Sequence, residues 1–130
     1  MTIGFDATQL SVSEGSGVLV IVLSAPSTDD GDFYLMLQRK DTDTEQDRAF
    51  GTDKPYLEYC GQGWSWYGHI EGFELMRDRV FVRMDAVAAS RMQNDGSLEV
   101  GFQFDEAQFE RLRVALERTF RDAGYYIARV

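Results

Sequence analysis

The chain of 130 residues carries 22 acidic and 13 basic residues, for a formal net charge of −9 at pH 7. Its length and its 44% apolar content predict one globular domain over residues 1–130 with its own core. The acidic balance argues against nucleic acid and against an anionic membrane surface as partners, because both require a basic footprint. No apolar run is long enough to span a bilayer, no signal peptide is expected, and Cys60 is the only cysteine. The expected location is therefore the reducing cytoplasm.

Apolar patterns predict strands through most of the chain. Residues 17–24 are apolar on both faces, which favours a central strand covered on both sides. Residues 32–39 alternate and predict the next strand, antiparallel to the first. Further strands are expected at residues 55–60, 70–76, 79–85, 97–104 and 125–129. Residues 40–54 lack a strand period and predict a long loop with one helical turn near its middle, and residues 86–93 predict a second turn of helix.

The clearest helix is predicted over residues 105–123. Asp105 is a suitable N-cap, and Gln108 stands three residues later, as a capping box requires. Gly124 is expected just past the C-terminal end. Because the strands come first and the long helix last, the sequence predicts an α+β fold. We expect a mostly antiparallel, curved β-sheet with one long C-terminal α-helix packed on it.

The sequence holds no motif for catalysis or for a cofactor. His69 and Cys60 are the only residues of their kinds, whereas a His/Cys metal site needs three or four ligands. A calcium loop starting at Asp41 would lack both the central glycine and the final glutamate. There is no phosphate-binding P-loop and no dinucleotide fingerprint. We therefore expect no enzyme activity, no cofactor and no metal ion.

Two segments stand out as candidates for binding. Residues 41–53 are rich in acids, and residues 61–69 combine three glycines with three aromatic rings. The acids are either a solvated loop or a docking surface for a basic partner. The rings are either core residues or rings displayed by the flanking glycines as a binding hot spot. The candidate partner-binding residues are Asp41, Asp43, Glu45, Asp47, Asp53, Trp64, Trp66 and Tyr67.

A spaced polar pattern runs through the middle of the chain. The pattern consists of YLMLQR at 34–39, Glu45-Gln46-Asp47, Gly51-Thr52-Asp53, Tyr56, Glu58, Gln62 and Tyr67-Gly68-His69-Ile70-Glu71. With FELMRDRVFVRMD and FDEAQFERLRVAL further on, it resembles the tenth catalogued family of immunity proteins of bacterial polymorphic toxin systems. The similarity is expected to cover roughly residues 33–122. The chain departs from the family pattern at His69, where a second glycine is typical.

The resemblance implies a non-enzymatic inhibitor that binds a cognate secreted toxin in the cytoplasm. A chain of charge −9 would be steered to a basic toxin, which the acidic loop and the aromatic segment 64–67 would occlude. We expect a monomer or a weak dimer. The alternative is a small-ligand-binding α+β domain with an aromatic-lined pocket, and a third possibility is a subunit of a larger complex joined through residues 125–129.

Overall fold

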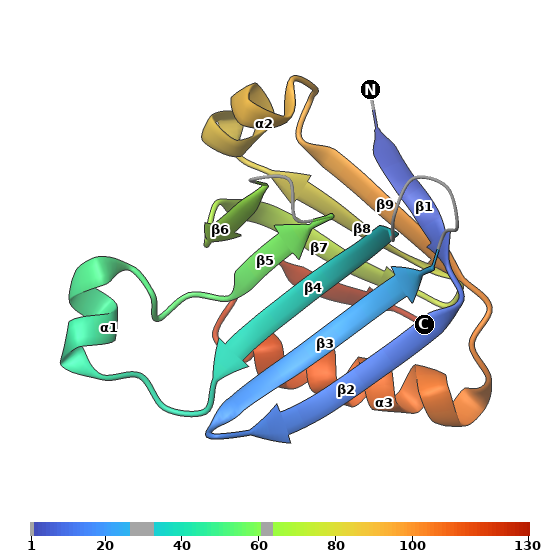
Figure 1. Cartoon of the computed structure of the whole chain (residues 1–130), viewed down its shortest axis with the longest axis horizontal. Helices are drawn as coiled ribbons and strands as arrows, with labels where there is room; N and C mark the ends of the chain where they lie inside the picture. The colour runs from blue at the N-terminus through green and yellow to red at the C-terminus, as the bar shows by residue number, and fades with distance from the viewer. Residues whose placement is uncertain (1, 27–32, 61–63) are drawn as a thin grey trace.

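The computed structural model describes residues 2–26, 33–60 and 64–130 (Figure 1). Two features named above lie partly outside these described residues: the first position of the strand expected at residues 32–39, and residues 61–63 of the aromatic segment, which include Gln62 of the spaced polar pattern.

Within the described residues, ten strands form two five-stranded sheets. The first sheet has the order β1 (Ile3–Ala7), β9 (Ser97–Phe102), β8 (Arg79–Met84), β7 (Ile70–Met76) and β10 (Tyr126–Arg129). The second sheet has the order β2 (Gln9–Gly15), β3 (Val18–Ala25), β4 (Phe33–Lys40), β5 (Tyr56–Tyr59) and β6 (Ser65–Tyr67). The described helices are α1 (Glu45–Phe50), α2 (Ala86–Met92) and α3 (Glu106–Thr119). None of them is long and apolar enough to cross a membrane.

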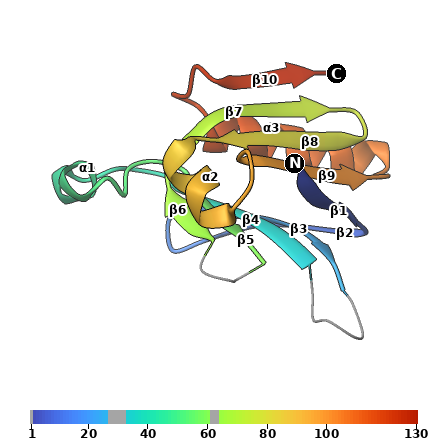
Figure 2. The ribbon, with the colours of Figure 1, turned by 90° about the horizontal axis from the view of Figure 1, so that it is seen from above.

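The predicted α+β class, the mostly antiparallel strands and the packed C-terminal helix are confirmed. Two pairings in the described sheets are parallel, β1 with β9 and β10 with β7, and the other pairs are antiparallel. The strands divide into two facing layers (Figure 2). Strands β1 and β2 had no counterpart in the sequence analysis, because short polar strands carry little hydrophobic signal.

The core lies between the two sheets and is completed by α3. Phe109 of α3 contacts Phe102 of β9, with ring centroids 6.5 Å apart. Phe120, just past α3, contacts Phe73 of β7 at 4.6 Å. On the other side, the buried Arg39 of β4 donates to the last carbonyl of the helix. One helix therefore joins both sheets.

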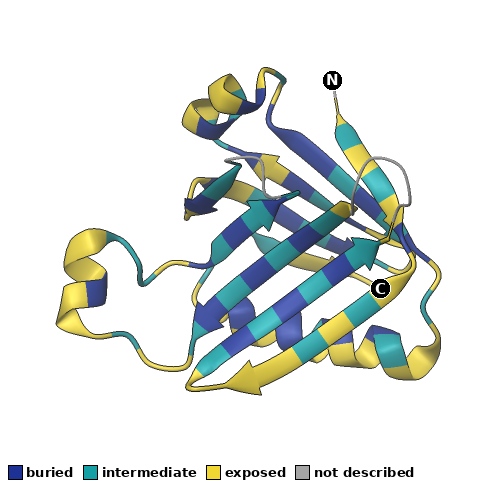
Figure 3. Ribbon diagram, viewed as in Figure 1, coloured by how far each residue is buried: buried dark blue, intermediate teal, exposed yellow. Residues whose placement is uncertain are grey.

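The prediction that residues 17–24 are covered on both sides is wrong. On β3, the inward-facing Leu19, Ile21 and Leu23 are buried, whereas Val18 and Val20 are only half-buried (Figure 3). No described helix packs over that outer face, so its residues are shielded by neighbouring strands of the same sheet rather than by a second layer.

The helix begins as predicted and ends earlier. Asp105 and Gln108 form the expected capping box, with Gln108 N donating to Asp105 Oδ1 at 2.8 Å. The helix stops at Thr119, and Phe120 rather than Gly124 follows its last turn. Phe120 leaves the helical path and stacks against Tyr126 at 5.3 Å, so tertiary packing decides where the helix ends.

Candidate partner-binding site

The acidic segment 41–53, called the acidic arm below, projects from the side of the second sheet with α1 near its tip (Figure 1). A capping box starts the helix: Asp47 N donates to Thr44 Oγ1 at 3.0 Å, and Thr44 N donates to Asp47 Oδ2 at 3.0 Å. Gly51 ends the helix with φ of +74°, a backbone conformation that glycine adopts at little cost. The predicted helical turn in this loop is thus confirmed.

Asp47 lies inside the acidic arm. Lys40 Nζ donates to Asp47 Oδ1 at 2.5 Å, and Thr52 Oγ1 donates to the same oxygen at 3.0 Å. The hydrogen bond from Lys40, followed by that from the Thr44 backbone, holds the pKa of the Asp47 carboxyl well below its usual range. The carboxylate is therefore occupied in fixing the helix and its attachment to β4.

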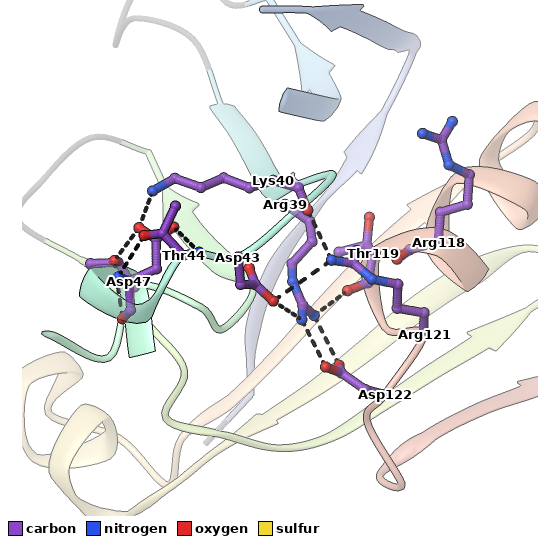
Figure 4. A network of polar contacts seen from close by, with 10 residues as sticks. Arg39, Lys40, Asp43, Thr44, Asp47, Arg118, Thr119, Arg121 and Asp122 are labelled. Atoms are coloured by element: carbon purple, nitrogen blue, oxygen red, sulfur yellow. Dashed lines mark hydrogen bonds and ion pairs between the residues drawn. The ribbon is translucent and has the colours of Figure 1, made fainter. Parts of the chain in front are cut away.

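The base of the arm is fastened to the end of α3 through a buried arginine (Figure 4). The side chain of Arg39 is only 2% exposed, and its Nη1 donates to Thr119 O at 2.9 Å. The same guanidinium donates to both carboxylate oxygens of Asp122, at 3.0 and 2.9 Å. Asp43 Oδ2 lies 3.7 Å from Arg39 Nη2 and 4.0 Å from Arg121 Nη2. This pairing makes Asp43, like Asp47, a structural acid of the arm.

The remaining acids of the arm are more accessible. Asp41 is exposed and pairs with the half-exposed Arg118 at 3.3 Å, Glu45 is exposed in the first turn of α1, and Asp53 is half-buried. At the last position of α1 stands Phe50, whose 73% exposure is the highest of any large apolar side chain described. Sequence reasoning missed Phe50, because a single aromatic residue in a short helical turn does not by itself indicate a contact surface.

The expectation of displayed rings holds for one residue of the aromatic segment. Trp66 is 7% exposed and belongs to the core, because it stands opposite Leu57 and faces the inside of the sheet. Trp64 is half-buried and stacks on Tyr59 with centroids 6.1 Å apart. Tyr67 is 44% exposed, since it lies on the outer face of edge strand β6. Strand alternation therefore removes Trp66 from the accessible surface.

The outer face of the second sheet gathers a second polar cluster. The pairing register sets Glu58 of β5 beside Met36 of β4, and Tyr56 beside both Gln38 and Tyr67. Side chains two residues apart on a strand share a face, so these groups point to the same side. We call this surface the tyrosine face, and its residues are Tyr34, Met36, Gln38, Tyr56, Glu58 and Tyr67.

Glu58 is the centre of the tyrosine face. The Tyr34 hydroxyl donates to Glu58 Oε2, and the Tyr56 hydroxyl donates to Oε1 at 2.7 Å. The ring of Tyr56 lies against that of Tyr67, with centroids 5.0 Å apart. Two tyrosines thus bind one carboxylate on a half-buried surface, and a third tyrosine packs against one of them.

The tyrosines and the carboxylate shift one another's protonation. The hydrogen bonds from Tyr34 and then Tyr56 lower the pKa of Glu58, so the group is ionised at neutral pH. The hydrogen bond to Glu58, together with burial, raises the pKa of Tyr34 to about 12. Burial first and the bond to Glu58 second raise the pKa of Tyr56. Both phenols therefore remain protonated donors.

The acidic arm and the tyrosine face are neighbours. Lys40 follows Gln38 on the same face of β4, and its ammonium group holds Asp47 of the arm. Tyr34, Gln38, Tyr56, Glu58 and Tyr67 all belong to the spaced polar pattern of the sequence, yet only Tyr67 was selected as a site residue. The missing signal was the pairing register, which brings positions 34–38 beside positions 56–58.

The single histidine and the single cysteine have local partners. His69 Nδ1 lies 2.7 Å from Asp85 Oδ2, and Asp85 also caps α2. His69 has φ of +62°, in the left-handed region that glycine enters most readily. Cys60 Sγ contacts Tyr34 O at 3.6 Å, and burial raises the pKa of its thiol. A raised thiol pKa disfavours the thiolate that nucleophilic chemistry needs.

A surface groove of about 870 Å³ runs beside β1 and β9. Its lining includes the phenylalanines Phe5, Phe102 and Phe104 beside the polar residues Asp6, Gln103 and Gln108. Part of the aromatic lining that the small-ligand alternative expected is therefore present, whereas most of the aromatic rings pack within the core or lie on the tyrosine face. The described residues contain no cluster of three or more His, Cys, Asp or Glu arranged to hold a metal ion.

Comparison with models of known protein families relates the chain to a family. The model of a family described as Immunity protein 10 matches residues 6–110. The match starts well before the expected residue 33, so it takes in β2 and β3, and it ends within α3 rather than at residue 122. No curated protein matches the chain.

Proposed function

The chain belongs to the Immunity protein 10 family, and from this premise we propose that it binds and neutralises a cognate secreted bacterial toxin domain in the cytoplasm. The observation that carries the proposal is the family match over residues 6–110. An immunity protein acts by binding, so the proposed function requires neither a catalytic group nor a cofactor. We expect the protein to act as a monomer or weak dimer.

We further propose that the protein occludes the active surface of the toxin with the acidic arm and the adjoining segment 64–67. The net charge of −9 favours a basic partner, because complementary charge accelerates association. Asp41, Glu45 and Asp53 supply the accessible charge of the arm, and Phe50 supplies an apolar anchor. Tyr67 is the accessible ring of the aromatic segment. Exposed aromatics beside charged residues are typical of binding hot spots.

The internal bonds of the arm support this role. Arg39 fastens its base through Asp43, and Asp47 fixes the start of α1. A projecting segment that is already ordered loses less conformational entropy on binding than a flexible loop does. Asp43 and Asp47 therefore hold the arm in shape, and its exposed acids are free to contact the toxin.

A pull-down from source lysate, with the protein as bait at low and at high salt, tests the proposal. We expect one specific partner, a basic toxin domain, that is released as salt screens the charges. With that partner purified, Glu45→Lys should slow association and Phe50→Ser should weaken binding about tenfold or more. The matched controls are Glu71→Lys on β7 and Val87→Ser on α2, which change an exposed acid and an exposed apolar residue elsewhere.

The outcomes separate the alternatives. Unchanged binding by both arm variants would move the contact surface away from the arm. Reversing Asp43 or Asp47 would be a poor test, since both hold the arm together. No toxin partner, together with a small molecule retained in native mass spectrometry, would replace the proposal with the ligand-binding alternative.

A further inference from the structure

The tyrosine face is an open sheet surface. Figure 2 shows the two sheets edge-on, with α3 and the first sheet on the inner side of β3, β4 and β5 and no described helix on their outer side. Along β4 and β5 the inner residues are fully buried, whereas the outer ones keep part of their surface accessible. Met36 and the valines of β3 make this surface partly apolar. Tyrosine and methionine are among the residue types enriched at protein interfaces.

Glu58 has no cationic partner within the described part of the chain. Its carboxylate accepts hydrogen bonds from two neutral phenols, and no lysine or arginine lies within ion-pair distance of it. Lys40, on the same face of β4, is engaged by Asp47. A half-buried carboxylate among apolar groups loses hydration, and a cation from a partner would compensate that loss.

The surrounding rings suit the same kind of group. The Tyr56 hydroxyl donates to the carboxylate, and the ring of Tyr56 lies against that of Tyr67, which is at the accessible edge of the sheet. Aromatic faces attract ammonium and guanidinium groups, most strongly where water is partly excluded. A carboxylate framed by tyrosines therefore selects a basic side chain over a neutral one of equal size.

We propose that the tyrosine face is a docking surface on which one lysine or arginine side chain of the toxin binds Glu58, against the rings of Tyr56 and Tyr67. This inference rests on the proposed function for the identity of the partner. It adds a second contact beside the acidic arm and identifies its central residue. The two surfaces adjoin at Lys40, so one toxin domain can contact both.

The test uses a probe that does not depend on the toxin. N-acetyl-arginine amide is titrated into the protein, with N-acetyl-citrulline amide as its neutral isostere, and the tyrosine ring resonances are followed by NMR. We expect saturable, millimolar binding of the arginine compound, with shifts in the rings of Tyr34, Tyr56 and Tyr67, and no saturation by citrulline.

Variants separate a docking role from a structural one. Glu58→Gln keeps the shape and one acceptor, and it should weaken the arginine compound about tenfold. Tyr67→Leu, at an exposed edge position, should weaken it several-fold through loss of the ring. Glu71→Gln removes an exposed acid on β7, outside both the face and the arm, and should change nothing. Tryptophan fluorescence verifies that each variant is folded.

Equal binding of the arginine and citrulline compounds, or an unchanged affinity in Glu58→Gln, would overturn the inference. The inference also fails if Glu58→Gln lowers the affinity for the arginine compound, yet the variant captures the toxin domain as well as the unaltered protein does. The toxin would then bind without using the tyrosine face. In both cases the proposed function survives. Failure of the unaltered protein to capture any toxin would instead refute the proposed function, whatever the probe does.

Discussion

Replacing Arg39 by methionine tests the connection between the acidic arm, the second sheet and α3. Methionine retains most of the aliphatic volume of arginine, so the substitution removes the charge and the hydrogen bonds without opening a large cavity. The lost bonds are one to Thr119 O and two to Asp122. The ion pair that holds Asp43 is lost as well.

The structure sets the size of the effect. The side chain of Asp122 is 64% exposed, so water can hydrate its carboxylate once Arg39 is gone. The loss of this ion pair therefore costs about 1 kcal/mol. Thr119 is buried, and leaving its carbonyl without a donor costs about 1–3 kcal/mol. We therefore expect the free energy of unfolding to fall by about 2–4 kcal/mol. At about 4 °C per kcal/mol for a domain of this size, the melting temperature should fall by about 8–16 °C.

Urea denaturation followed by the fluorescence of Trp64 and Trp66 measures this loss. Arg118→Met is the matched control, because the ion pairs that Arg118 makes with the described residues Glu14 and Asp41 lie at the surface. It should cost less than about 1 kcal/mol. Asp122→Ala, alone and combined with Arg39→Met, completes a double-mutant cycle. The losses in free energy of unfolding of the two single variants should add up to at least about 1 kcal/mol more than the loss of the double variant.

A loss of less than about 1 kcal/mol in Arg39→Met would refute this reasoning, since it would mean that the Thr119 carbonyl finds another donor at no cost. Equal losses in Arg39→Met and Arg118→Met would also refute the reasoning, because the burial of Arg39 would then add nothing to the free energy of unfolding.

Three further predictions follow from the described contacts. Folding lowers the pKa values of Asp47 and Glu58. Both carboxylates therefore stabilise the fold above the unfolded carboxyl pKa, and this stabilisation is lost as the pH falls below about 4. Between pH 7 and pH 3, the urea midpoint of Asp47→Asn should fall less than that of the unaltered protein. Tyr34 should ionise near pH 12, and spectrophotometric titration should show a lower pKa in Glu58→Gln, because the neighbouring carboxylate is gone. Gly96 has φ of +86°, and a β-carbon at this position would lie 2.9 Å from Met84 O. Gly96→Ala should therefore lower the free energy of unfolding by about 1–3 kcal/mol in urea denaturation. An unchanged midpoint would mean that the turn relaxes without cost.

Local chemistry was predictable from the sequence, and long-range contacts were not. The capping box of Asp105 and Gln108 depends on residues three apart, and it forms as expected. The end of the same helix depends on Phe120 packing against Phe73 of a distant strand, which no local pattern reveals. Propensity sets where a helix can start, whereas the core decides where it stops.

The same distinction applies to the candidate site. The acids of the arm are alike in the sequence, yet contacts with Arg39 and Lys40 make Asp43 and Asp47 structural and leave Glu45 exposed. The tyrosine face depends on the register between two strands that are about twenty residues apart in the chain, so spacing alone did not bring out Glu58.

The parallel pairing of β1 with β9 has a consequence for the order in which the protein folds. It joins residues 3–7 to residues 98–102, whereas the tyrosine face uses only residues 34–67, on strands that follow one another as antiparallel neighbours. Contacts close in sequence form sooner, because less chain entropy is lost in closing them. During synthesis the surface proposed to bind the toxin can therefore form first, whereas β1 can pair only after its partner strand β9 has been synthesised.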